Sequence, residues 1–126
     1  MDYKPFKLRG TKMACVAEFG IIDNLEEYDE HEYNPSKYHC TAIDDDFISA
    51  WWNELVLIKT YFHTLSRPEF GLARCGITLI PPESLEAFYK IIAKDKHSRT
   101  SEELIDLMKI VRMAINQNKY VIHYGV

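Results

Sequence analysis

The segment DDDFISAWWNELVLIKTYFHTLS, residues 44–66, constrains the fold more than any other, because it is long and its apolar residues recur at helical spacing. Asp44 is placed to cap the free N–H groups of a first helical turn, and Asp45 and Asp46 would follow at the positive end of the helix dipole. The apolar positions lie three or four residues apart and are Ile48, Trp51, Leu55, Ile58, Phe62 and Leu65. The sequence therefore predicts a helix of about twenty residues at the centre of the core, ended by the turn residues that follow Ser66.

Four apolar stretches that contain β-branched residues predict strands. They are residues 13–22, 38–43, 72–80 and 120–126. The first two are separated by a polar run that ends in the turn sequence NPSK. We therefore expect them to pair antiparallel, with residues 23–37 as an acidic loop between them.

Two further segments have the signals of helix starts. The sequence PPESLEAFYKII, residues 81–92, opens with two prolines whose missing N–H groups suit a first helical turn. The sequence TSEELIDLMKIVRMAINQN, residues 100–118, has Thr100 and Glu103 at capping-box spacing. Together with the strands, these helices give the order β-β-α-β-α-α-β. This order predicts an α+β fold in which about four strands of a mainly antiparallel sheet pack on three helices.

The length and the cysteine content favour one domain in a reducing compartment. The 126 residues suit a single domain, residues 1–126, that folds without a metal or a disulfide. Cys15, Cys40 and Cys75 are far apart and odd in number, which is typical of reduced thiols in a cytoplasmic protein, and we interpret them as small buried hydrophobic side chains. No stretch predicts a membrane-spanning helix, and residues 1–12 lack the apolar region of a signal peptide.

The net charge of −4 conceals an uneven distribution along the chain. Residues 1–12 hold four basic residues and one acid, whereas residues 13–46 hold ten acids and a single base, Lys37. The acidic balance argues against nucleic acid as the main partner, because binding to phosphates needs concentrated positive charge. One hypothesis for the basic residues of 1–12 is that they lie against the acidic segment of the same chain.

The densest negative charge is the acidic stretch DNLEEYDEHEY, residues 23–33, which holds six carboxylates and no Lys or Arg. Three interpretations of this stretch stand. It is a cation-binding loop, although its acids do not follow EF-hand spacing and no glycine lies between them. It is a solvated or disordered loop, because like charges repel and hydrate well. Or it is a docking surface, because a basic partner would relieve the repulsion, and Tyr28 and Tyr33 offer contact area.

No sequence pattern indicates a particular reaction. The histidines form no HExxH or HxH cluster, and no glycine-rich phosphate loop occurs. A nucleophilic pair of Cys40 or Cys75 with a histidine stays open as an arrangement, without a local signature for it. We therefore predict no catalytic residue, no metal ligand and no cofactor.

The leading functional hypothesis is a non-enzymatic, cytoplasmic protein of bacterial type that binds a basic protein partner, as a toxin-neutralising immunity protein would. The predicted partner-binding residues are Glu26, Glu27, Tyr28, Asp29, Glu30, Glu32, Tyr33, Asp45 and Asp46. One alternative is a small enzyme with a pocket lined by Cys or His. Another is a structural homo-oligomer, such as a homodimer, that associates through the aromatic helix. Neither a membrane nor nucleic acid is the expected main partner.

Overall fold

The computed structural model describes residues 6–9 and 12–125. Within them, seven strands form one antiparallel sheet, with six strands in the order β1-β2-β7-β6-β4-β5 and the seventh, β3, paired to β2. The strands are β1 (Phe6–Arg9), β2 (Lys12–Ile22), β3 (Thr41–Asp44), β4 (Lys59–Phe62), β5 (Pro68–Phe70), β6 (Ile77–Ile80) and β7 (Tyr120–Tyr124). The hypothesis about the basic residues of 1–12 lies outside the described side chains.

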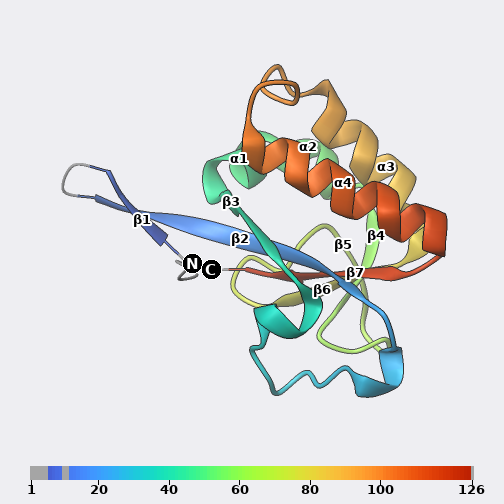
Figure 1. The fold of residues 1–126 in the computed structure, drawn as a ribbon. Coiled ribbons are helices and arrows are strands. Elements are labelled where there is room, and N and C mark those ends of the chain that lie inside the picture. Colours follow the sequence, from blue (N-terminus) through green and yellow to red (C-terminus); the bar gives the residue numbers. More distant parts are fainter. Residues whose placement is uncertain (1–5, 10–11, 126) are drawn as a thin grey trace.

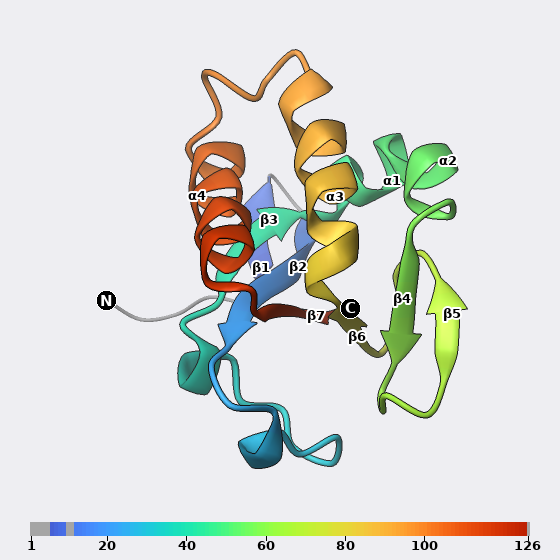
Figure 2. The same ribbon diagram turned by 90° about the vertical axis from the view of Figure 1, so that its right-hand side faces the viewer.

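The helices lie on one side of this sheet (Figure 1, Figure 2). Among the described residues the α-helices are α1 (Asp45–Ala50), α2 (Trp52–Leu55), α3 (Pro82–Lys94) and α4 (Glu102–Gln117). The segment between β2 and β3 lies against the opposite face and contains two 3₁₀ helices, η1 (Leu25–Glu27) and η2 (Pro35–Tyr38). The α+β class with an antiparallel sheet is confirmed, but the expected numbers, about four strands and three helices, are wrong. No helix of the described residues has the length and apolar content needed to cross a membrane.

The predicted helix of residues 44–66 is the main error. Asp44 does cap a helix, because its carboxylate accepts a hydrogen bond from the N–H of Asp46 at 2.9 Å. That helix is the short α1, and after one further turn, α2, the chain enters β4. Strand β4 pairs with β5 on one side and with β6 on the other. The apolar residues of 58–62 suit a strand as well as a helical stripe, and this long-range pairing decides for the strand.

The remaining elements are confirmed where the sequence signal is local. Residues 13–22 and 120–124 form strands, β2 and β7, and both predicted amphipathic helices are present as α3 and α4. Helix α4 is capped one residue later than expected. The hydroxyl of Ser101, and not that of Thr100, accepts a hydrogen bond from the N–H of Leu104, at 3.4 Å.

Two predicted strands are shorter than expected. The stretch 72–80 contributes only its last four residues, as β6, because residues 72–76 form a turn and loop. The stretch 38–43 begins its strand at Thr41, because His39 adopts a left-handed backbone conformation with φ of 52°. The predicted antiparallel pairing of this strand with the first one is confirmed, with β3 running alongside β2.

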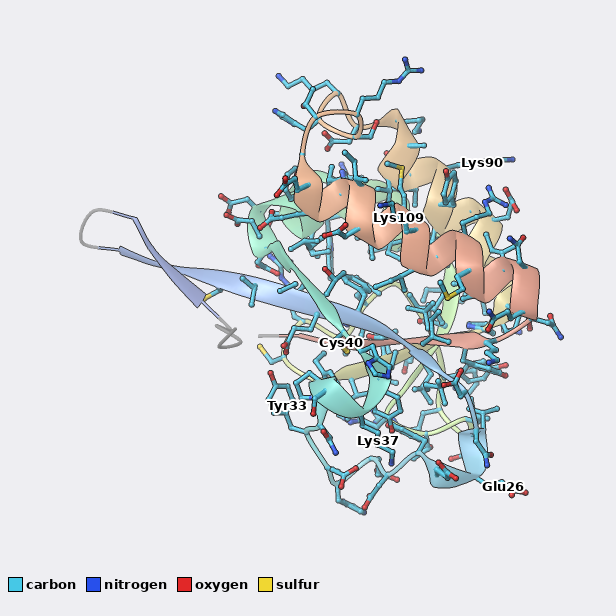
Figure 3. The ribbon with its side chains drawn as sticks, in the orientation of Figure 1. Glu26, Tyr33, Lys37, Cys40, Lys90 and Lys109 are labelled. Carbon is cyan, nitrogen blue, oxygen red and sulfur yellow. The ribbon has the colours of Figure 1, made fainter. Side chains whose placement is uncertain are left out.

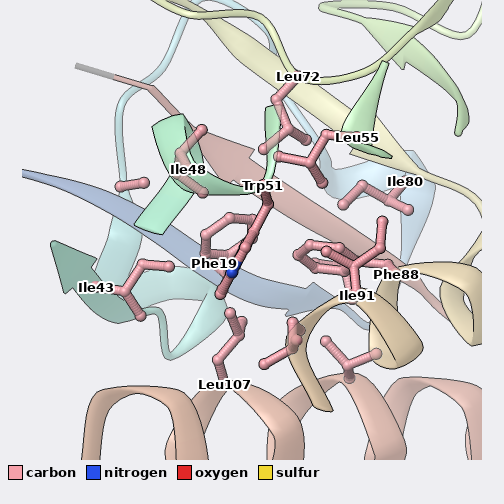
Figure 4. Close-up of a cluster of buried hydrophobic side chains, with 14 of the residues drawn as sticks. Phe19, Ile43, Ile48, Trp51, Leu55, Leu72, Ile80, Phe88, Ile91 and Leu107 are labelled. Carbon is pink, nitrogen blue, oxygen red and sulfur yellow. The ribbon is translucent and has the colours of Figure 1, made fainter. Parts of the chain in front are cut away.

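Apolar side chains cover both faces of the sheet. The larger cluster lies between the sheet and the helices and includes Phe19, Trp51, Phe88 and Leu107 (Figure 4). A smaller cluster lies on the opposite face and consists of Ile22, Tyr38, Ile77, Leu79, Ile122 and Tyr124, with Tyr28, Cys40, Tyr61 and Tyr120 packed against it. The segment between β2 and β3 supplies Tyr28, Tyr38 and Cys40, so it covers this second face and does not hang from the sheet as a free tip.

Candidate functional site

The two tyrosines of the acidic stretch fasten it to the sheet. The Tyr28 hydroxyl donates a hydrogen bond to the carbonyl oxygen of His63, in the loop after β4, at 2.6 Å. The Tyr33 hydroxyl donates to Oε1 of Glu18 on β2, at 2.5 Å. Tyr28 is half-buried, whereas Tyr33 keeps 59% of its surface exposed. The tyrosines that we predicted as contact residues therefore also hold the stretch in place.

Side-chain oxygens order the turns of the same segment. Asn24, Asp29 and Asn34 each accept a hydrogen bond from a backbone N–H two or three residues further along the chain, at 3.0, 2.8 and 3.3 Å. Such bonds stabilise turns and short helical starts, because they satisfy N–H groups that have no other partner there. The many Asn and Asp residues of the segment are thus partly explained by its backbone.

Two lysines compensate part of the negative charge. The ammonium group of Lys37 contacts the backbone carbonyl of Glu27 and lies 3.5 Å from the carboxylate of Glu32. The ammonium group of Lys119 lies 2.6 Å from the carboxylate of Asp23. Exposed pairs of this kind contribute at most about 1 kcal/mol each, so they position the segment more than they stabilise the fold.

Three other glutamates of the stretch lack a cationic partner in the described part of the chain, and of these Glu26 and Glu27 are exposed and Glu30 is half-buried. Among the described residues, no ion pair reaches the carboxylate of Glu26, Glu27 or Glu30. We call these three carboxylates, together with those of Asp29 and the Lys37-paired Glu32, the acidic surface. It lies on the side of the sheet opposite to α3 and α4, as the positions of Glu26 and Lys109 show (Figure 3).

The structure does not bring Asp45 and Asp46 to this surface. Both belong to α1, which lies with the other helices on the far side of the sheet (Figure 1). Asp46 is exposed, and the carboxylate of Asp45 lies 3.6 Å from the guanidinium of Arg74. Burial raises the pKa of Asp45 above its ordinary value, and the nearby Arg74 charge opposes that shift. The nine predicted contact residues therefore divide into seven that lie in one segment and two that lie elsewhere.

Glu18 is a site residue that our sequence reasoning missed. It is only 4% exposed, on the part of β2 that pairs with both β3 and β7. Its Oε1 accepts the hydrogen bond from Tyr33, while its Oε2 is buried and has no hydrogen-bond partner among the described residues. Burial raises the pKa of this carboxyl above its ordinary value, and the Tyr33 hydrogen bond opposes the rise. The available signal was a single charged residue inside the apolar strand MACVAEFGII.

Gly20 allows the segment to approach the sheet. A Cβ atom at this position would lie 2.5 Å from the carbonyl oxygen of Tyr38 and 2.8 Å from the sulfur of Cys40. Both distances are shorter than van der Waals contact, so a larger residue would push the segment away. Position 20 of β2 thus determines how closely residues 38–40 can pack.

The cysteines differ from the buried set that we expected. Cys15 and Cys75 are exposed, and only Cys40 is partly buried. Burial, reinforced by the negative charge of Glu18, raises the pKa of the Cys40 thiol to about 12. No group of three or more His, Cys, Asp or Glu side chains in the described part of the chain is arranged to hold a metal ion.

The aromatic helix proposed as an oligomer interface is absent. Trp51 is 4% exposed and lies in the larger core cluster, where its indole N–H donates to the carboxylate of Asp95 at 2.8 Å. Trp52 is half-buried, and the guanidinium of Arg74 lies 4.9 Å from the centre of its ring. Neither indole is thus presented as a free contact surface.

Comparison of the chain with protein-family models, with curated proteins and with solved structures found no match in any of the three.

Proposed function

We propose that this protein binds a basic protein partner through the acidic surface, as an immunity protein that neutralises a basic toxin would. The observation that supports the proposal is the set of three carboxylates, on Glu26, Glu27 and Glu30, without a cationic partner among the described residues. Like charges so close together in the sequence repel one another, and a basic partner relieves the repulsion. The proposal leaves out Asp45 and Asp46, because they belong to α1, which lies with the other helices on the opposite side of the sheet.

The acidic stretch is held in a fixed position, and this favours binding of a partner to its carboxylates. Tyr28 attaches the acidic stretch to the loop after β4, and Tyr33 attaches it to β2. A segment that is already ordered loses little conformational freedom when a partner docks, so less of the interaction energy is spent on ordering. The negative potential also increases the rate of encounter with a basic protein.

Reversing the three unpaired charges tests the proposal. We expect the variant E26K/E27K/E30K to lose affinity for the partner by at least about tenfold, because favourable charge contacts become repulsive. The partner is identified by affinity capture at low salt followed by mass spectrometry. The affinities of both proteins are then measured by calorimetry at low and high salt.

The matched control is E69K/E83K/D106K, which changes the net charge equally at exposed positions outside the acidic stretch. It is expected to bind the partner nearly as well as the unchanged protein. Two results would refute the proposal. One is capture of no basic protein, and the other is equal loss of affinity in both triple variants.

The alternative of a small enzyme with a reactive cysteine predicts a different behaviour for Cys40. With a pKa of about 12, its thiol is almost fully protonated near neutral pH, and the thiolate is the form that attacks. We expect Cys40 to react with dithionitrobenzoate at least about 100-fold more slowly than the exposed Cys75. The variants C15S/C75S and C15S/C40S isolate these two thiols for a direct comparison of rates. A rate for Cys40 well above that of the exposed Cys75 would restore the enzyme hypothesis.

A further inference from the structure

The buried carboxyl of Glu18 is incompletely bonded. A carboxylate offers about four acceptor positions, and buried polar atoms nearly always have a partner. Oε1 of Glu18 accepts one hydrogen bond, from Tyr33, and Oε2 accepts none from the described residues. The side chain points toward the segment that carries the acidic surface, because its single bond is to Tyr33 of that segment. An unsatisfied acceptor in this place indicates a donor that arrives from outside.

The Tyr33 side chain shields this carboxyl and is placed so that it can rotate away from it. More than half of its surface is exposed, and its ring meets Tyr124 edge-on with the centroids 4.9 Å apart. The next residue, Asn34, is held independently, because its N–H donates to the Tyr124 hydroxyl at 3.3 Å. The Tyr33 side chain can therefore turn away from Glu18 while the backbone beside it stays in place. Figure 3 shows Tyr33 at the edge of the segment, on the same side of the sheet as Cys40 and Lys37.

Open space lies in the same segment, a few residues after Tyr33. A cavity of about 390 Å³ is lined by Pro35, Ser36, His39 and Cys40. Cys40 packs against Gly20, which is two residues from Glu18 on the same strand and has its side-chain position on the same face. The cavity thus borders Cys40, which lies close enough to Glu18 for the carboxylate charge to act on its thiol.

The chemistry of the site favours a guanidinium group. The missing partner of Oε2 is a donor, and the surrounding carboxylates of the acidic surface attract cations. A guanidinium presents parallel N–H groups that match both oxygens of a carboxylate, and it also stacks on aromatic rings such as those of Tyr33 and Tyr124. A lysine ammonium has neither the fork nor the planar face.

We propose that Glu18 is the anchor of the acidic surface and that it pairs with an arginine side chain of the basic partner, which displaces the Tyr33 hydroxyl and reaches Oε2. This inference rests on the proposed function and adds the residue type that the partner must present. The acidic surface then supplies attraction for any cation, and Glu18 supplies the preference for arginine.

Two blocked pentapeptides test the anchor without knowledge of the partner. One consists of five lysines, and the other carries arginine at the central position. We expect the unchanged protein to bind the arginine peptide about tenfold more tightly at low salt, as measured by NMR titration. In the isosteric variant Glu18→Gln the two peptides should bind equally. In E26K/E27K/E30K both should weaken by the same factor, with the preference for arginine retained.

A second variant keeps the test decisive if Glu18→Gln does not fold. Tyr33→Phe removes the hydroxyl that competes for Glu18, so the preference for the arginine peptide should rise a few-fold. If the hydroxyl has a purely structural role, the ratio of the two affinities will not change. That result would refute the proposed pairing of Glu18 with arginine. Equal binding of both peptides to the unchanged protein would overturn it as well, while leaving the acidic surface intact. Binding of neither peptide, or no effect of the triple reversal, would instead refute the acidic surface and the anchor together.

Discussion

Lowering the pH from 6.5 to about 4 is expected to remove about 3 kcal/mol of the unfolding free energy, because of His123 on β7. This imidazole is 2% exposed, packs with its ring centre 4.9 Å from that of Phe19, and lies 3.1 Å from the hydroxyl of Thr78. Burial lowers its pKa to about 3, and the positive charge of Arg74 contributes to the shift. The folded protein therefore excludes a proton that the unfolded chain takes up.

The sign follows from proton linkage. Between pH 6.5 and about 3 the unfolded state binds one more proton than the folded state at this site, so stability falls as the pH falls. The slope is about 1.4 kcal/mol per pH unit, a large share of the roughly 5–15 kcal/mol that typically holds a domain folded. Glu18 and Asp45 act in the opposite direction, because each has a raised pKa and each gains a proton more readily in the folded state.

The measurement is urea unfolding between pH 7 and pH 4, for the unchanged protein and for His123→Gln. Glutamine cannot titrate but retains a group that can bond the Thr78 hydroxyl. The unfolding free energy of the variant should depend less steeply on pH. The difference between the two slopes should correspond to about one bound proton. Parallel profiles for the two proteins would contradict a neutral, buried His123.

The parts of the fold that the sequence predicts correctly are those whose signals are local. Helices α3 and α4 have starting residues, turn-by-turn apolar stripes and sufficient length, all within one segment. The failure at 44–66 has a physical cause. Its apolar residues lie at helical spacing, but those of β4 gain more from pairing with β6 and β5 than a continued helix would offer. The pairing partners follow later in the chain, so no window around residue 60 reveals them.

Some features of the candidate site can likewise be predicted from the sequence, and others depend on long-range contacts. The acidic stretch is visible as composition, and the turn residues within it are visible as Asn, Asp and Pro. The role of Glu18 is not visible, because it depends on a contact with Tyr33 that forms only when the segment between β2 and β3 folds back over one face of the sheet. The separation of Asp45 and Asp46 from the acidic stretch is likewise a consequence of β3, which carries the chain from one side of the sheet to the other (Figure 1).

The largest effect of a single substitution is expected at Phe19. Its side chain is fully buried at the centre of the larger cluster, and its ring centre lies 5.5 Å from that of Phe88 on α3 (Figure 4). Phe19→Ala removes these contacts and leaves a cavity, which should cost about 3–5 kcal/mol of unfolding free energy. Phe19→Leu retains most of the volume and should cost less, about 1–2 kcal/mol, in the same urea measurement.

The position of Phe19 also separates stability from recognition. Glu18 and Phe19 are neighbours on β2, so their side chains point to opposite faces of the sheet. Phe19→Ala should therefore lower the stability without changing the ratio of affinities for the arginine and lysine peptides, as long as the titration is done where the variant is folded. Glu18→Gln should do the reverse and abolish that ratio. A loss below about 1 kcal/mol in Phe19→Ala would contradict the packing, and a changed peptide ratio would mean that the two faces of β2 do not act independently.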